Sequence, residues 1–206
     1  RAIRDVYKRQ YLDHAATSPV HPEVVATISD TLAHTFGNAS SSYQRGRDSR
    51  AIIDQARQVF ASSLSCQADE IVITSGGSES NNTAIIKTAQ TNADKGKHII
   101  TTAIEHQSVL KPMNYLESLG FEVTYLPVNQ DGVVDLDDFD QALRDDTILV
   151  SIMHGNNQIG SLQPIKAIGD RLAGHQAFFH TDAVQSYCKV PIDVKDLQVD
   201  FLSVSA

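Results

Sequence analysis

The sequence predicts an α/β protein built on a mainly parallel sheet that is covered by helices on both faces. From about residue 98 onward, short β-branched runs alternate with stretches of helical periodicity, which is typical of repeated strand–helix–strand units. Glycine or proline marks many of the junctions between these segments. With 206 residues and 41% apolar side chains, the chain can bury a large core. We therefore expect one domain, or one large domain that lacks its completion.

The N-terminal part of the chain predicts two helices. Residues 1–10 (RAIRDVYKRQ) differ in pattern from all that follows, so we expect a non-native leader there and the domain proper over residues 11–206. Residues 11–18 are expected to form a short strand-like opening, and proline then marks the start of a helix over residues 23–34. After a loop, apolar residues recur at helical spacing and predict a long amphipathic helix over residues 45–64.

A turn of small residues follows the next apolar run. The β-branched run at residues 71–74 suits a buried strand, and Gly76 and Gly77 can adopt positive φ angles without a Cβ penalty. Ser78 is the expected N-cap of a helix over residues 79–89. We call Gly76, Gly77 and Ser78 the glycine turn. Its backbone N–H groups would face outward at the positive end of a helix, which favours a phosphate, although an ordinary capped turn is the alternative.

The spacing around the glycine turn fits neither a Walker loop nor the dinucleotide-binding fingerprint. After it, the chain predicts strands at residues 98–102, 121–126, 147–153, 177–180 and 199–203, and helices at residues 108–119, 136–144 and 165–173. Ligands of such sheets gather at the carboxyl ends of the strands. The residues that follow each strand are therefore the candidate site residues.

Polar side chains of types used in catalysis follow these strands: His106, Asn157, Asp182, Gln185 and Ser205. Each has an ordinary explanation, with His106 and Asp182 as helix caps, Asn157 as a turn residue and Ser205 as a loop hydroxyl. Together with the glycine turn, however, they suit a phosphorylated aromatic cofactor with a basic ring nitrogen, and pyridoxal 5'-phosphate is such a molecule. A carboxylate would keep the ring nitrogen protonated, and a stacked imidazole would fix the plane of the ring.

Composition excludes several other classes of protein. The net charge of −8 argues against a nucleic-acid partner, and neither an apolar run of 18 residues nor a signal peptide is present, so we expect no membrane association and a cytoplasmic location. Cys66 and Cys188 form no Cys-x-x-Cys pair and are expected to be partly buried free thiols. The eight histidines lack metal-binding spacing, so we expect no metal site.

Six motifs along the chain resemble those of cysteine desulfurases of the iron–sulfur-assembly type, in the class-V aminotransferase group of pyridoxal-phosphate enzymes. They are Tyr11-Leu12-Asp13 with Ala16-Thr17, Gly37-Asn38-Ala39-Ser40-Ser41, Thr74-Ser75-Gly76-Gly77-Ser78-Glu79-Ser80-Asn81-Asn82, Ile104-Glu105-His106, Asn156-Asn157-Gln158-Ile159-Gly160, and His180-Thr181-Asp182-Ala183-Val184-Gln185. Their order and spacing match the family from residue 11 to residue 206. The resemblance implies the large domain of a fold-type I pyridoxal-phosphate enzyme.

The resemblance also implies a role for each candidate residue. Gly77 and Ser78 would hold the cofactor phosphate, with a further hydroxyl from Ser205, while Asp182 would pair with the pyridine nitrogen. His106 would stack on the ring and help to move protons. The remaining two candidates, Asn157 and Gln185, would contact the ring hydroxyl or its surroundings. Similar proteins are homodimers that convert L-cysteine to L-alanine and pass sulfur to an acceptor or scaffold protein for iron–sulfur clusters or tRNA thiolation.

Three positions depart from the family pattern. Gln158 stands where glutamate is usual and His14 where asparagine or tyrosine is common, and both are expected to be tolerated. Cys188 stands where glycine usually precedes the lysine, which is compatible only if the backbone there does not need positive φ.

The resemblance places several functional parts after residue 206: the lysine that holds the cofactor covalently, the arginine that binds the substrate carboxylate, and the loop cysteine that accepts sulfur. It also implies that an antiparallel strand from beyond residue 206 inserts between the segments at residues 71–74 and 199–203. We therefore expect the 206-residue chain by itself to be an inactive fragment. Alternatives are a selenocysteine lyase, another class-V aminotransferase, or a catalytically dead binding or dimerisation fragment.

Overall fold

The computed structural model describes residues 11–205, and the leader expected at residues 1–10 lies outside this range. Contacts divide the chain into two compact units, with the boundary between residues 53 and 54. The first unit contains α1 (Pro22–His34) and the start of α2 (Gln44–Leu64), which confirms both expected helices. The strand-like opening expected at residues 11–18 is wrong: Ala16 N donates to the backbone and side chain of Asp13, which closes a turn instead.

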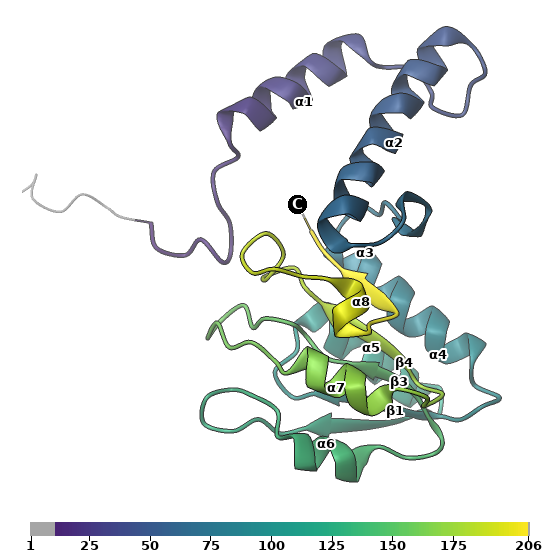
Figure 1. Ribbon diagram of the computed structural model, residues 1–206, viewed down its shortest axis with the longest axis vertical. Coiled ribbons are helices and arrows are strands. Elements are labelled where there is room, and N and C mark those ends of the chain that lie inside the picture. Colours follow the sequence, from purple (N-terminus) through teal and green to yellow (C-terminus); the bar gives the residue numbers. More distant parts are fainter. Residues whose placement is uncertain (1–10, 206) are drawn as a thin grey trace, which may run out of the picture. The chain divides into compact units, whose positions relative to one another are not determined.

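The second unit is built on a five-stranded parallel sheet, which confirms the prediction of a mainly parallel sheet. Its strands are β1 (His98–Thr102), β2 (Glu122–Leu126), β3 (Thr147–Ser151), β4 (Phe178–Asp182) and β5 (Phe201–Ser203). They lie in the order β2-β1-β3-β4-β5, with every neighbouring pair parallel. In Figure 1 the helices of this unit lie on either side of the strands. Because all strands run the same way, their carboxyl ends share one edge of the sheet.

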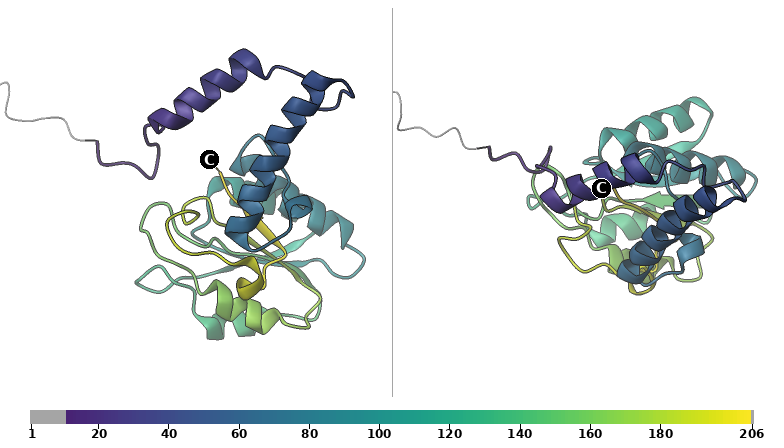
Figure 2. Two further views of the ribbon diagram at one scale, coloured as in Figure 1. Left: turned by 45° about the horizontal axis from the view of Figure 1, so that its top comes forward. Right: turned by 90° about the horizontal axis from the view of Figure 1, so that it is seen from above.

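Helices connect the strands and cover both faces of the sheet. They are α3 (Gly77–Asn82), η2 (Thr83–Lys87), α4 (Thr88–Thr91), α5 (Gln107–Ser118), α6 (Leu136–Ala142), α7 (Ile165–Leu172) and α8 (Val194–Leu197), and a short turn η1 (Ala68–Glu70) precedes them. None of the described helices combines the length and apolar character that a bilayer span requires. Figure 2 shows the same layers from two further directions.

Alternate side chains of the strands build two separate cores. Ile100 and Val150 point to the face covered by α6 and α7, where they join a buried cluster with Phe139. Their neighbours Ile99 and Leu149 point to the opposite face, which η2, α4 and α5 cover. This two-sided burial explains why β1 and β3 are buried at every position rather than at alternate positions.

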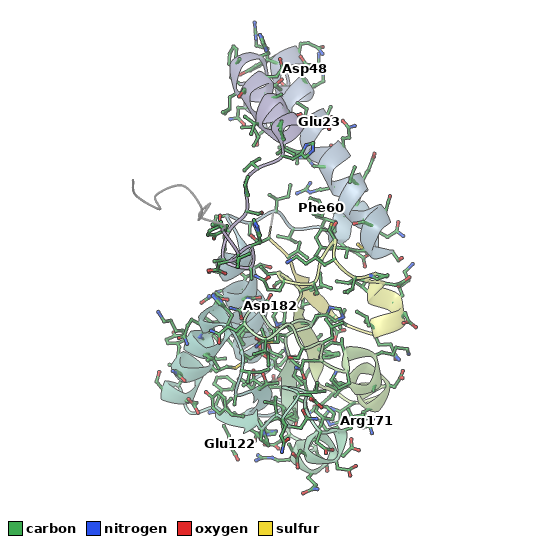
Figure 3. The ribbon with its side chains drawn as sticks, turned by 90° about the vertical axis from the view of Figure 1, so that its left-hand side faces the viewer. Glu23, Asp48, Phe60, Glu122, Arg171 and Asp182 are labelled. Atoms are coloured by element: carbon green, nitrogen blue, oxygen red, sulfur yellow. The ribbon has the colours of Figure 1, made fainter. Side chains whose placement is uncertain are left out.

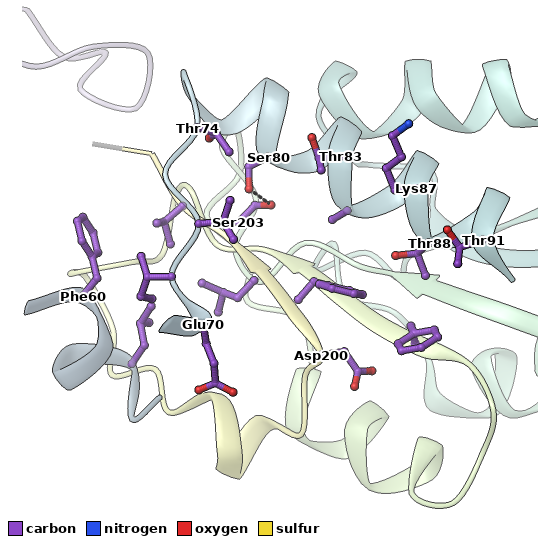
Figure 4. A pocket seen from close by; sticks show the side chains of 18 of the residues that line it. Phe60, Glu70, Thr74, Ser80, Thr83, Lys87, Thr88, Thr91, Asp200 and Ser203 are labelled. Atoms are coloured by element: carbon purple, nitrogen blue, oxygen red, sulfur yellow. Dashed lines mark hydrogen bonds between the residues drawn. The ribbon is translucent and has the colours of Figure 1, made fainter. Parts of the chain in front are cut away.

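The strand expected at residues 71–74 is wrong. The segment is extended but has no ladder partner, and Val72 and Ile73 are 77% and 56% exposed. A β-branched run becomes a strand only where a neighbouring strand pairs with it, and among the described residues this segment has no such partner; Ile71 N donates instead to Ala68 O at the end of η1. Residues of this segment and of β5, the edge strand, line the same groove of about 520 Å³ (Figure 4). Insertion of a further strand at this place stays a prediction.

The backbone at Cys188 is in the left-handed region, with φ at +59°. The condition for tolerating cysteine at this family glycine position is therefore not met, because an L-residue has a steric cost there that glycine does not. Cys188 is also exposed, and Cys66 is half-buried, so the expectation of partial burial holds only for Cys66.

Replacement of Cys188 by glycine is expected to raise the free energy of unfolding by roughly 1 kcal/mol, because it relieves the left-handed strain at a small entropic cost. Urea denaturation of the two proteins measures the difference. Cys188→Ala is the matched control, since it removes the thiol but keeps Cβ. An equal gain from alanine would contradict this explanation.

Candidate functional site

The glycine turn joins the segment at residues 71–74 to the helical stretch that begins with α3. Gly76, with φ at +154°, is the residue before the helix, so Gly76 and not Ser78 is the N-cap. Ser78 was predicted to cap the helix but lies in its first turn, because α3 begins at Gly77. The backbone N–H of Ser75 donates to Glu79 Oε2 at 2.6 Å, and hydrogen bonding from the Ser75 side chain, together with this backbone contact, lowers the pKa of the Glu79 carboxyl.

Gly77 lies where the chain segments crowd together. A Cβ atom at this position would lie 3.0 Å from Val184 Cγ2 and 3.7 Å from Ser205 Cβ. The side chain of Ser205 therefore lies beside the glycine turn, as the sequence predicted, although the two are 128 positions apart. Any larger residue at Gly77 would have to displace the Val184 side chain by a few tenths of an ångström, so glycine favours this close approach between the helix start and the segments that follow β4 and β5.

Asp182 is the last residue of β4 and carries a buried carboxylate at the carboxyl end of the sheet. Figure 3 shows it far from Glu122, the first residue of β2, which marks the opposite end. Two donors hold the carboxylate: Val184 N at 3.0 Å from Oδ1 and Asn81 Nδ2 at 2.7 Å from Oδ2. The strand was predicted to end two residues earlier, so Asp182 belongs to the rigid sheet rather than to a loop.

His106 caps helix α5 and remains exposed. Its Nδ1 accepts from the backbone N–H of Ser108 at 3.1 Å and lies 2.8 Å from Ser108 Oγ. The capping role that the sequence offered as an ordinary explanation is therefore real. The cap fixes the imidazole by one nitrogen and leaves the rest of the ring accessible.

Asn157 and Gln185 occupy the loops that follow β3 and β4. Asn157 is half-buried, and its neighbour Asn156 ties the loop to Ile104 O at 3.1 Å. Gln185 is also half-buried and accepts from Lys189 Nζ at 3.3 Å. Both residues thus lie on loops at the carboxyl edge of the sheet, where the sequence predicted them.

Glu105 is a buried acid that the sequence did not assign to the site. Its Oε1 accepts from Thr102 Oγ1 at 2.8 Å and from Met153 N at 2.9 Å, whereas the buried Oε2 has no partner among the described residues. Burial raises the pKa of Glu105 to about 8, and the Asp182 carboxylate adds to the rise against the two hydrogen bonds. Glu105 is therefore protonated near neutral pH, with the proton on Oε2.

Asn81 was also missed. It is fully buried in α3, on the same helical face as the fully buried Ile85 and Ala89, four and eight residues later. A polar residue within an apolar stripe of this spacing is the signal that could have identified it.

Comparisons with known proteins identify the family. A sequence model described as "Aminotransferase class-V" matches residues 10–206. The chain belongs to the aminotransferase class-V family. Among curated relatives of this family, the cysteine desulfurase IscS of Dictyoglomus turgidum is 50% identical over 196 residues, which is 95% of this chain and 50% of that protein. The cysteine desulfurase IscS of Methanosarcina thermophila is 52% identical over 198 residues, 96% of this chain and 49% of that protein.

Solved structures of similar proteins share the fold. A structure described as "SspA in complex with cysteine" has a TM-score of 0.91 at 40% identity and covers 95% of this chain and 56% of that chain. A structure described as "NIFS-LIKE PROTEIN" has a TM-score of 0.93 at 35% identity, over 96% and 55% of the two chains. This class-V aminotransferase chain spans about half the length of the curated relatives it matches.

Replacement of Glu105 by glutamine is expected to stabilise the protein progressively as pH rises. The folded-state pKa lies above the unfolded value, so the contribution of Glu105 to stability is complete below about pH 4.5 and is lost between about pH 4.5 and 8. Glutamine mimics the protonated acid and cannot ionise. The variant should therefore gain up to ~1.4 kcal/mol over wild type for each pH unit in this window and nothing further above it.

Urea unfolding of both proteins at pH 5, 6, 7, 8 and 9 measures this difference. The matched control is Glu23→Gln, which removes one exposed carboxylate from α1. A difference between Glu105→Gln and wild type that is the same at every pH would contradict the neutral state of Glu105.

Proposed function

We propose that the complete protein is a pyridoxal-phosphate-dependent cysteine desulfurase, and that this chain supplies most of the cofactor site. The conversion would be from L-cysteine to L-alanine, with the sulfur retained as a protein persulfide. The curated relatives described above are named cysteine desulfurases, which supports this activity over that of other class-V enzymes. The proposal rests on one structural observation: the buried Asp182 carboxylate and the glycine turn occur at the same edge of one sheet.

The residues present fit the cofactor. The Asp182 carboxylate is held by two donors and offers an acceptor for a protonated ring nitrogen. Gly77 has no Cβ atom, so no side chain at that position covers the backbone N–H groups of the turn. Ser78, within that turn, and Ser205, beside it, are both exposed, and their hydroxyls would complete a phosphate site.

Each remaining candidate residue has a proposed role. His106 would stack on the cofactor ring and help to move protons, because Ser108 fixes its Nδ1 and the ring stays exposed. From the loops after β3 and β4, Asn157 and Gln185 would contact the ring hydroxyl or its surroundings.

Bound pyridoxal phosphate would supply an electron sink for the carbanion formed at the substrate Cα. The role of this chain in that chemistry is positional and electrostatic. Asp182 would hold the proton at the ring nitrogen, and the neutral Glu105 would avoid a second negative charge beside it. The glycine turn would bind the phosphate and so fix the ring over the sheet edge.

We also propose that the complete protein is a cytoplasmic homodimer that passes sulfur to an acceptor or scaffold protein. The two cysteines are free thiols, which suits a reducing compartment. Iron–sulfur cluster assembly or tRNA thiolation would consume the sulfur. Nucleic acid and membrane are not proposed as partners.

The 206-residue chain supplied with pyridoxal phosphate and L-cysteine is expected to release no alanine. None of its eight lysines occupies the motif position of the cofactor lysine, so the covalent step has no nucleophile in this chain. Chromatographic quantification of alanine is the measurement. Stoichiometric or greater alanine release by this chain would contradict the inference that the cofactor lysine is absent from it.

In the product of the complete reading frame, Asp182→Ala is expected to lower turnover by at least about 100-fold, because proton-holding groups at a reacting centre contribute typically 10²–10⁴-fold. The matched control is Asp140→Ala, which removes a partly exposed carboxylate that pairs with Arg171. Wild-type turnover in the Asp182 variant would show that the ring-nitrogen assignment is wrong.

A further inference from the structure

One amide side chain joins the buried carboxylate of the site to its imidazole. Asn81 donates from Nδ2 to Asp182 Oδ2 at 2.7 Å and to Ser108 Oγ at 2.9 Å. Ser108 Oγ lies 2.8 Å from His106 Nδ1. The four side chains form a continuous hydrogen-bonded path, which we call the Asp182–His106 path, across α3, β4 and the start of α5.

The chemistry of its two ends fixes the direction of every hydrogen bond in the path. A carboxylate only accepts, so the NH₂ group of Asn81 must face Asp182, and its second hydrogen then reaches Ser108 Oγ. At the other end, the backbone N–H of Ser108 can only donate, so His106 Nδ1 must be the unprotonated nitrogen. The Ser108 hydroxyl therefore accepts from Asn81 and donates to His106, which leaves the ring proton on Nε2.

The burial of Asn81 shows that the path has an energetic cost. The residue is fully buried, and its Oδ1 is a buried acceptor with no partner among the described residues. An unpaired buried amide oxygen costs free energy that an apolar side chain in the same stripe would avoid. Packing therefore does not explain asparagine at this position, whereas the two contacts of its NH₂ group do.

We propose that Asn81 is a positioning residue that holds the Asp182 carboxylate and, through the Ser108 hydroxyl, orients the His106 imidazole. This inference rests on the proposed cofactor site, in which Asp182 meets the ring nitrogen and His106 meets the ring face. One amide thereby aligns the two protein groups that contact the cofactor ring from different elements. The Ser108 backbone N–H keeps the ring proton at His106 Nε2, the nitrogen outside the path.

The test uses the holoenzyme from the complete reading frame and the substitution Asn81→Leu, which keeps the approximate size and removes the hydrogen bonds. Two quantities are measured: the dissociation constant for pyridoxal phosphate, from absorbance, and the imidazole ¹⁵N chemical shifts of His106, from NMR. The expected result is a dissociation constant about tenfold higher, the loss of roughly one charge-assisted hydrogen bond. The His106 Nδ1 shift should also move, because the Ser108 hydroxyl, no longer held by Asn81, can turn away from Nδ1 and remove one of its hydrogen bonds.

Asn92→Leu is the matched control, because Asn92 is also a buried asparagine, directly after α4, and its Nδ2 donates to Thr88 O at 2.9 Å while its Oδ1 accepts from Lys95 Nζ at 2.9 Å, both away from the path. Neither quantity should change in that variant. If Asn81→Leu fails to fold, Ser108→Ala removes the middle of the path, and the same movement of the His106 shifts is expected. Unchanged His106 shifts in a folded Asn81→Leu or Ser108→Ala protein would overturn the proposal, even if cofactor affinity falls.

Failure of this inference and failure of the proposed function give different results. The His106 shifts are also measured in the cofactor-free protein, where they report the path without any ligand. A wild-type protein that neither binds pyridoxal phosphate nor releases alanine would refute the proposed function. Movement of the His106 shifts in the variant would still support the path in that case.

Discussion

The functional end of the sheet depends on one interaction: the hydrogen bonding of the buried Asp182 carboxylate. A carboxylate at the end of a central parallel strand is costly unless donors surround it. The chain supplies those donors from both sides, with Val184 N from the following turn and Asn81 Nδ2 from α3. The same constraint acts on Glu105, whose pKa is raised by burial and by the Asp182 carboxylate, so that Glu105 is neutral near neutral pH. The result is a single negative charge, fixed in the rigid part of the fold.

Around this charge, close packing brings together segments that are distant in sequence. Gly77 lets the start of α3 approach Val184 and Ser205, while Asn81 on the next turn reaches Asp182. A separate polar path crosses the sheet just beneath, where His180 lies between Ser151 Oγ at 2.8 Å and Ser203 Oγ at 3.0 Å. Burial lowers the pKa of His180 to about 4, so this imidazole is neutral and serves as a hydrogen-bonding link rather than as an acid.

Much of this architecture could be predicted from the sequence, because its strands and helices bury apolar faces with clear periodicity. The strand β1 was predicted with its observed bounds, and the carboxyl-edge positions of His106 and Asp182 followed from the alternation of strands and helices. The features that could not be predicted depend on which other groups of the folded chain lie nearby. Residues 71–74 have strand-like composition but no ladder neighbour, and the role of Asn81 depends on groups 27 and 101 positions away. The left-handed backbone at Cys188 is likewise set by the turn around it and not by the residue itself.

The central claim is that the glycine turn and Asp182 form the two ends of one cofactor site. The most direct test is a crystal structure of the complete reading-frame product grown with pyridoxal phosphate. The account predicts the phosphate against the backbone N–H groups of Gly77 and Ser78, with Ser205 Oγ beside it, and the ring nitrogen within hydrogen-bond distance of Asp182. A cofactor bound elsewhere, or bound with its ring nitrogen away from Asp182, would contradict it.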